Sequence, residues 1–155
     1  MIILFDIFIF LFNQNLLLIA FFSLLSSTQA RSVIYLNIKG KGVQNIINNT
    51  FKYNPSAVYV KGNLNSTCTK SCYLGDTDGV NNNITLIFNN QIETCANMFS
   101  GLSNIQEIDL SNFDTSLVTN MYSMFNGCTS LQKLNFNNIN TSLVQNMRYL
   151  FYKCY

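Results

Sequence analysis

The side chains of this sequence that could carry chemistry are acids and cysteines, because the chain contains no histidine. The lack of imidazole excludes a Ser–His or Cys–His nucleophile pair and a histidine metal ligand. Two carboxylates across a cleft could still hydrolyse a glycosidic bond. Three of the four candidate acids fall within one short stretch, however, which predicts a polar surface rather than an acid–base pair. We therefore expect neither enzyme activity nor a cofactor from the four, which are Glu93, Glu107, Asp109 and Asp114.

Two further motifs resemble ligand sites but lack the residues that would complete them. Residues 76–81 cluster carboxylates beside a glycine, as calcium loops do, yet the twelfth position of such a loop would be Ile87. Gly40-Lys41-Gly42 could cradle a phosphate, but neither the third glycine of a dinucleotide fingerprint nor a Walker lysine–Ser/Thr pair follows. We expect a polar turn and a tight loop, with no metal bound.

Five cysteines remain to be explained. The spacing of Cys68 and Cys72 lacks the companion pair that a zinc site needs, and a disulfide is favoured in an exported protein. Cys68 could pair with Cys72, or with Cys95 while Cys72 stays a buried thiol. Cys128 and Cys154 occupy equivalent positions in two similar stretches of sequence, which is compatible with two stacked thiols or with a disulfide.

The overall composition narrows the class of protein. The 155 residues suit a single domain. Nine Lys and Arg against seven Asp and Glu leave a scattered net charge of +2, too balanced for a protein that grips nucleic acid. The chain is polar mainly through its 24 asparagines rather than through charge.

Residues 1–30 predict a signal peptide. The apolar run 16–25 is followed by small residues ending at Ala30, after which we expect cleavage. A second apolar run, 2–12, leaves an uncleaved membrane anchor as the alternative, although Asp6 disfavours one continuous span. In both cases we expect the rest of the chain to be secreted or to lie at the cell surface. A membrane is contacted only through residues 1–30, and only if they stay uncleaved.

Four N-x-S/T sequons are consistent with export from a eukaryotic cell, although an asparagine-rich chain also generates such sequons by chance. The acceptor candidates are Asn48, Asn65, Asn83 and Asn140.

A repeat with a period of about 26 residues dominates the second half of the chain. Residues 98–125 align with 124–151, with like residues at more than a dozen positions, among them Met121 and Met147. Each copy combines an apolar–polar–apolar strand pattern with a helical apolar face over Leu117–Phe125. A strand plus a helix in each copy predicts an α/β leucine-rich-repeat-like right-handed solenoid, with a short parallel strand and a helix in each coil.

The same spacing extends weakly upstream. We interpret 31–93 as degenerate coils that cap the N-terminal end of the repeats in 94–155. Strands are expected at 33–38, 57–60 and 84–88, and a helix over 43–51 would form a right-handed βαβ crossover. No polar cap follows the last copy, so we expect an incomplete array that is part of a longer product or associates end to end.

Residues 97–131 resemble the 26-residue repeat of BspA-like leucine-rich-repeat surface proteins, which also defines a domain of unknown function in mycoplasma surface lipoproteins. The most specific matching segments are Asp109–Ser116 and Val118–Met121, and the likeness covers roughly residues 92–155. The resemblance implies a secreted or surface-attached recognition protein without catalytic residues. The chain lacks a lipoprotein cysteine after its apolar segment, so a lipid anchor is not implied.

Two functions are compatible with these features. The first is a recognition or adhesion module that binds a protein or glycan partner through the strand face of the repeats. The second is a structural spacer or envelope component without a specific ligand. The partner-face candidates are the residues that differ between the copies, namely Gln106, Glu107, Asp109, Gln132, Lys133 and Asn135.

Overall fold

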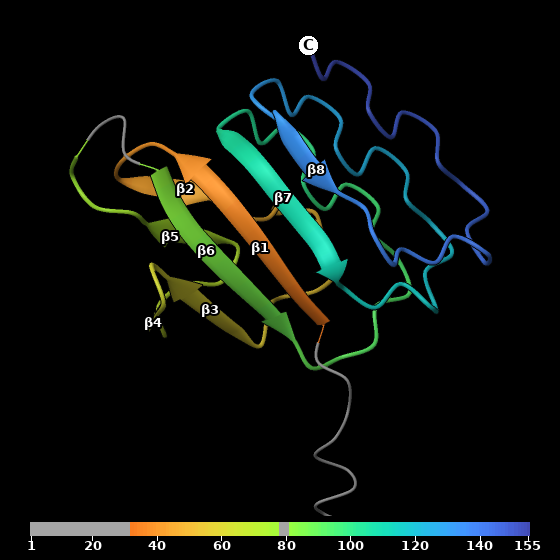
Figure 1. The fold of residues 1–155 in the computed structure, drawn as a ribbon, viewed down its shortest axis with the longest axis horizontal. Helices are drawn as coiled ribbons and strands as arrows, with labels where there is room; N and C mark the ends of the chain where they lie inside the picture. Colours follow the sequence, from red (N-terminus) through yellow and green to blue (C-terminus); the bar gives the residue numbers. More distant parts are fainter. Residues whose placement is uncertain (1–31, 78–80) are drawn as a thin grey trace, which may run out of the picture. The chain divides into compact units, whose positions relative to one another are not determined.

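The computed structural model describes residues 32–77 and 81–155, in which the chain folds into β-strands and turns (Figure 1). The strands are β1 (Ser32–Lys39), β2 (Val43–Asn45), β3 (Ala57–Val60), β4 (Asn63–Leu64), β5 (Ser71–Tyr73), β6 (Asn81–Phe88), β7 (Ile105–Asn112) and β8 (Lys133–Asn135). Six of them form one sheet in the order β4-β3-β6-β1-β7-β8, and β2 pairs with β5. The predicted signal peptide lies outside the described residues.

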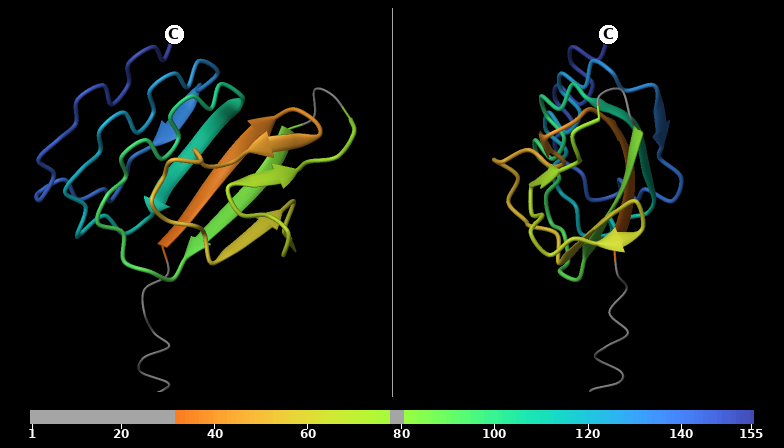
Figure 2. Two further views of the ribbon diagram at one scale, coloured as in Figure 1. Left: turned by 180° about the vertical axis from the view of Figure 1, so that it is seen from behind. Right: turned by 90° about the vertical axis from the view of Figure 1, so that its left-hand side faces the viewer.

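The large sheet is antiparallel except at one end. Strand β1 pairs antiparallel with β6 and β7, β6 pairs antiparallel with β3, and β8 runs parallel to β7. Side chains alternate along β1, where Ile34, Leu36 and Ile38 are buried and Tyr35 is exposed. This period of two is what a sheet with one face on the core requires. Figure 2 shows the sheet as one layer, with the β2–β5 pair and the turns of 94–155 on the other side of the core.

The predicted α/β solenoid with a helix in each coil is wrong. The described residues contain no helix, and the sheet is mixed rather than a row of parallel strands. The physical reason lies in the backbone, because an α-helix requires an unbroken run of right-handed residues. That run is broken by a left-handed residue in each copy, at Asn97 (φ 60°), Ser123 (φ 52°) and Tyr149 (φ 59°), and again at Gly101 and Gly127.

The predicted capping coils of 31–93 are also wrong. Strands do lie at the predicted 33–38, 57–60 and 84–88, but β6 is inserted between β1 and β3, so these two strands do not form a βαβ unit. The segment predicted as a helix over 43–51 forms β2 and turns. Of the apolar residues on the predicted helical face, Ile46, Ile47 and Phe51 are buried and Val43 is exposed. The apolar spacing identified core residues but not the backbone that carries them.

Three turn-rich segments recur along the chain and stack on one another, and we call them rung 1 (94–102), rung 2 (120–128) and rung 3 (146–154). Parallel bridges join Thr94 to Asn120 and Asn120 to Asn146. Alternate amides of each rung donate to carbonyls of the next one. In rung 1 the amides of Cys95, Asn97, Phe99 and Gly101 donate to Asn120, Tyr122, Met124 and Asn126. In rung 2 those of Met121, Ser123, Phe125 and Gly127 donate to Asn146, Arg148, Leu150 and Tyr152. The three rungs lie side by side in Figure 2.

No helix in the described part of the chain is long and apolar enough to cross a membrane.

Candidate functional site

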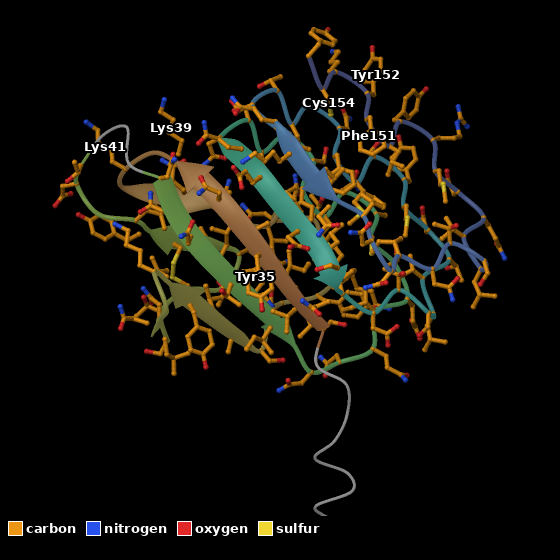
Figure 3. The ribbon with its side chains drawn as sticks, viewed as in Figure 1. Tyr35, Lys39, Lys41, Phe151, Tyr152 and Cys154 are labelled. Carbon is orange, nitrogen blue, oxygen red and sulfur yellow. A yellow bond between two sulfur atoms is a disulfide. The ribbon has the colours of Figure 1, made fainter. Side chains whose placement is uncertain are left out.

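The outward face of the six-stranded sheet carries two continuous rows of polar and aromatic side chains. One row crosses five strands through paired residues, and the neighbouring row crosses four. The first consists of Tyr59, Thr85, Tyr35, Asp109 and Asn135, and the second of Asn83, Asn37, Glu107 and Lys133. We call these nine residues the open sheet face. Figure 1 looks onto it, and Figure 3 shows Tyr35 near the middle of the sheet.

The alternation of the strands is what places these side chains outward. Next to them along β1 and β6 lie Leu36, Ile84 and Leu86, each at most 3% exposed. Tyr35, by contrast, is 45% exposed although its strand lies at the centre of the sheet. A one-residue slip of β1 would reverse this arrangement and expose the core, so the position of the tyrosine is strongly fixed.

Hydrogen bonds and charges give the open sheet face a defined polarity. Asn37 Nδ2 donates to Asn83 Oδ1 at 3.0 Å, and Lys133 Nζ donates to Glu107 Oε1 at 2.7 Å. Hydrogen bonds from the side chain and backbone of Ser111 lower the pKa of Asp109. Asp109 is therefore a carboxylate at neutral pH, next to an ion pair that is largely solvated.

The two acids of the open sheet face do not have the arrangement of a glycosidase pair. Glu107 and Asp109 lie on one strand of an open face instead of flanking a cleft, which glycoside hydrolysis needs. Among the described residues, no group of three or more Cys, Asp or Glu side chains could hold a metal ion. The other two candidate acids lie elsewhere, since Glu93 pairs with Lys52 at 3.3 Å and Asp114 accepts a hydrogen bond from the Ser116 amide.

The structure brings together four of the six predicted partner-face residues, namely Glu107, Asp109, Lys133 and Asn135. Gln106 lies at an irregularity in the pairing of β7, where its carbonyl accepts from the Gln132 amide at 2.8 Å. These two glutamines therefore lie at the end of the strand pair and outside the rows. The residues of the open sheet face that were not among these candidates are Tyr35, Asn37, Tyr59, Asn83 and Thr85. The period-two pattern of 32–39 and 81–88 was the signal that could have identified most of them.

The sequon asparagines have different environments. Asn48 Nδ2, the atom that would carry a glycan, donates to the carbonyl of Ser100 at 2.6 Å, so the fold itself uses that nitrogen. Asn83 lies on the open sheet face, Asn140 is exposed and Asn65 is half-buried. Glycosylation at these positions stays a prediction, and a glycan on Asn83 would cover part of the face.

The five cysteines form one disulfide and three free thiols. A disulfide joins Cys68 to Cys72, whose Cα atoms are 4.8 Å apart, and Cys95, Cys128 and Cys154 are free thiols. Of the pairings that the sequence left open, the structure thus contains the one within 68–72 and stacked thiols at 128 and 154. Burial raises the pKa of Cys95 and of Cys128 to about 12, so neither is a nucleophile at neutral pH.

Two motifs remain, one described in part and one in full. The Tyr73 hydroxyl donates to the Asp76 carboxylate at the start of the segment 76–81 that was predicted as a polar turn, of which residues 78–80 lie outside the described part. The loop after β1 closes through a hydrogen bond from Gln44 Nε2 to the Lys41 carbonyl at 2.6 Å. Gly40 and Gly42 both have positive φ there, which explains the two glycines.

Comparisons with known proteins found no match among curated proteins and none among solved structures. A family model described as "Mycoplasma protein of unknown function, DUF285" matches residues 69–155, which include β6, β7, β8 and all three rungs. No match supports the resemblance to BspA-like repeats. Because the matched segment is more than half of the chain, the protein belongs to the mycoplasma protein family of unknown function DUF285.

Proposed function

We propose that this chain is an exported recognition module that binds a protein or glycan partner through the open sheet face. The observation that carries the proposal is the row of Tyr59, Thr85, Tyr35, Asp109 and Asn135, which places two tyrosines among hydrogen-bonding groups across five strands. The resemblance of the repeats to those of BspA-like surface proteins supports a recognition role.

The physical argument concerns Tyr35. An antiparallel sheet normally presents polar residues to water, so a polar face alone indicates no function. A half-exposed tyrosine in the middle of that face is different, because its ring offers a flat apolar surface and its hydroxyl a hydrogen bond. Thr85 and Asp109 are its cross-strand neighbours and provide a hydroxyl and a carboxylate. This combination suits the apolar and hydroxylated faces of a sugar, or a polar protein surface with an apolar residue at its centre.

Export is the second part of the proposal. It depends on the apolar segment 1–30 with its small residues before Ala30, and the Cys68–Cys72 disulfide is consistent with an oxidising compartment. We expect a secreted or cell-surface protein, with a membrane anchor in residues 1–30 as the alternative.

The test compares two tyrosines of similar exposure. The full chain and its Tyr35→Ala and Tyr73→Ala variants are measured against a panel of immobilised oligosaccharides and a panel of purified extracellular-matrix proteins. Tyr73 is 52% exposed but lies on β5, outside the large sheet. We expect binding to at least one probe, weakened by at least about tenfold in Tyr35→Ala and unchanged in Tyr73→Ala. Equal losses in both variants contradict the proposal, and no binding to either panel favours the structural spacer.

A further inference from the structure

Two tyrosines of the open sheet face lie in line across three neighbouring strands, which Figure 1 shows side by side. Tyr59 on β3 pairs with Thr85 on β6, and Thr85 pairs with Tyr35 on β1. The Cα atoms of paired residues in antiparallel strands are alternately about 5.5 and about 4.5 Å apart. A residue between two such strands has one pair of each kind, so the two tyrosines are about 10 Å apart on the same side of the sheet.

The residues beside the tyrosines determine the direction in which a ligand could contact both. The outward neighbours of Tyr35 along β1 are Val33 and Asn37, neither of which has a ring. A ligand that contacts both tyrosines must therefore cross the strands, and beyond Tyr35 it reaches Asp109 on β7. Along this path the face offers a ring, a hydroxyl, a second ring and a carboxylate at intervals of about 5 Å.

The composition of the open sheet face favours a hydroxylated ligand over a protein surface. The centre of a protein–protein interface is normally apolar and depleted of charge. None of the nine residues of this face is aliphatic, and three of them are charged, namely Glu107, Asp109 and Lys133. Two carboxylates against one ammonium group leave an excess of negative charge. Carboxylates accept hydrogen bonds from hydroxyl groups and disfavour an anionic ligand, so the face suits a neutral one.

A β-1,4-linked sugar chain has the geometry that this row requires. Each ring of such a chain is turned over relative to the last one, so alternate rings present the same face to a surface. The length of the disaccharide repeat is close to twice the strand spacing, which is also the separation of the two tyrosines. A sugar ring combines an apolar C–H face, which packs on an aromatic ring, with hydroxyl groups along its edge.

We propose that the open sheet face binds a neutral β-1,4-linked glycan that crosses the strands, with alternate sugar rings stacked on Tyr59 and Tyr35. This inference rests on the proposed function and narrows the partner to one class of polysaccharide. The ring between the tyrosines lies over the hydroxyl of Thr85, and the ring after Tyr35 donates a hydrogen bond to the Asp109 carboxylate. Three consecutive rings are then the shortest ligand that contacts both tyrosines.

The test measures the affinity of the full chain for linear oligosaccharides of increasing length by titration calorimetry. The probes are β-1,4-linked oligomers of glucose and of N-acetylglucosamine, and α-1,4-linked glucose oligomers of the same lengths are the matched control. We expect the trimer of at least one β-1,4-linked series to bind at least about tenfold more tightly than the dimer, because one ligand then engages both tyrosines. The α-1,4-linked trimer should show no such gain, since its chain curves away from a straight row.

Variants of the tyrosines identify the surface that binds. In Tyr59→Ala the trimer should bind no more tightly than the dimer, and in Tyr35→Ala binding of the trimer should fall at least about tenfold. Tyr59→Phe keeps the ring and should keep the gain of the trimer, which provides a test that does not depend on the stability of the alanine variants. Tyr73→Ala, on β5 outside the large sheet, should change neither affinity.

The outcomes separate this inference from the proposed function. A matrix protein that binds through Tyr35 while no oligosaccharide binds leaves the proposed function intact and overturns the glycan. Equal affinity for trimers of both linkages, or a gain of the trimer that persists in Tyr59→Ala, overturns the glycan as well. Absence of binding to every oligosaccharide and every matrix protein overturns both proposals.

Discussion

Rungs 2 and 3 have nearly the same sequence pattern and the same backbone conformation, yet one is core and the other is surface. Met121, Phe125 and Cys128 are at most 1% exposed, whereas Met147 is 41% and Phe151 49% exposed. Ser123 and Tyr149 both have positive φ, at 52° and 59°. The comparison shows that the pattern specifies the path of the chain, while burial depends on a neighbour at each edge of the rung.

Rung 1 completes the comparison because its outer edge is covered by residues outside the repeat. Asn48 uses its backbone and its side chain to bond Met98 and Ser100, and Asn48 itself is held by Thr50. Residues 31–93 thus flank the repeats at this edge, through Asn48 on rung 1 and through the pairing of β1 with β7, although not as the coils that were expected. The following predictions test how much each edge contributes.

The largest expected difference is between Phe125→Ala and Phe151→Ala. Removing the buried ring should lower the free energy of unfolding by about 3–5 kcal/mol, as is usual for a phenylalanine in a core. Removing the half-exposed ring should cost about 1–2 kcal/mol, because less apolar surface is buried there. Urea denaturation of the two variants and the parent chain measures both values. Equal costs would show that rung 3 is covered in solution.

The second-largest loss of stability is expected at the edge of rung 1 that Asn48 covers. Asn48→Ala removes the donor to Ser100 O and leaves a partly buried carbonyl without it, at a cost of about 1–2 kcal/mol. Asn49→Ala is the matched control, since Asn49 is exposed and its side chain makes no hydrogen bond with the described residues. In thermal denaturation, Asn48→Ala should have a lower melting temperature than Asn49→Ala. A control that destabilises as much as Asn48→Ala would show that the turn, not the cap, is responsible.

The alkylation rates of Cys128 in rung 2 and Cys154 in rung 3 allow the same comparison of a buried with a half-buried position. Cys128 is buried and Cys154 half-buried, so iodoacetamide at pH 8 should alkylate Cys154 at least about tenfold faster, as peptide mass mapping would show. The pKa of Cys95 and of Cys128 is raised by burial from 9.0 to about 12, and the unfolded chain therefore loses these protons first. Their contribution to stability is complete below pH 9 and is lost as the pH rises toward 12. Similar alkylation rates would contradict the difference in burial.

The smallest expected effect concerns a left-handed position. Gly101 and Gly127 become Lys153 in rung 3, where φ is 58°. Lys153→Gly should stabilise the chain by about 0.5 kcal/mol, since relief of backbone strain exceeds the added entropy of the unfolded chain. Gly127→Ala is the reverse change and should destabilise by about 1 kcal/mol. Paired thermal denaturation curves test the two signs, and a destabilising Lys153→Gly would show that the lysine side chain contributes more than its backbone costs.

The longer strands of the large sheet could be predicted from the sequence, because alternation in 32–39 and 81–88 is strong, whereas β2 was mistaken for a helix and β4 and β5 were not predicted. The sheet order could not, since nothing local indicates that β6 lies between β1 and β3. The rungs were mistaken for helices because Met121, Met124 and Phe125 have helical spacing. Only Gly101 and Gly127 hinted at left-handed backbone, whereas Ser123 and Tyr149 gave no such signal. Of the open sheet face, the residues on β7 and β8 were predicted as candidates, whereas the tyrosines of β1 and β3 were not.

The central position of β1 has a consequence for how the chain folds during synthesis. Strand β1 is the first described strand to be made, but its partners follow much later, since Ser32 pairs with Phe88 and Val33 with Asn112. Until both arrive, Ile34, Leu36 and Ile38 have no sheet in which to be buried. Such long-range pairing makes folding slow compared with helical proteins of similar size. A nascent chain halted before residue 112 should therefore be sensitive to protease and dependent on a chaperone, and the domain should become resistant only once β7 has been made.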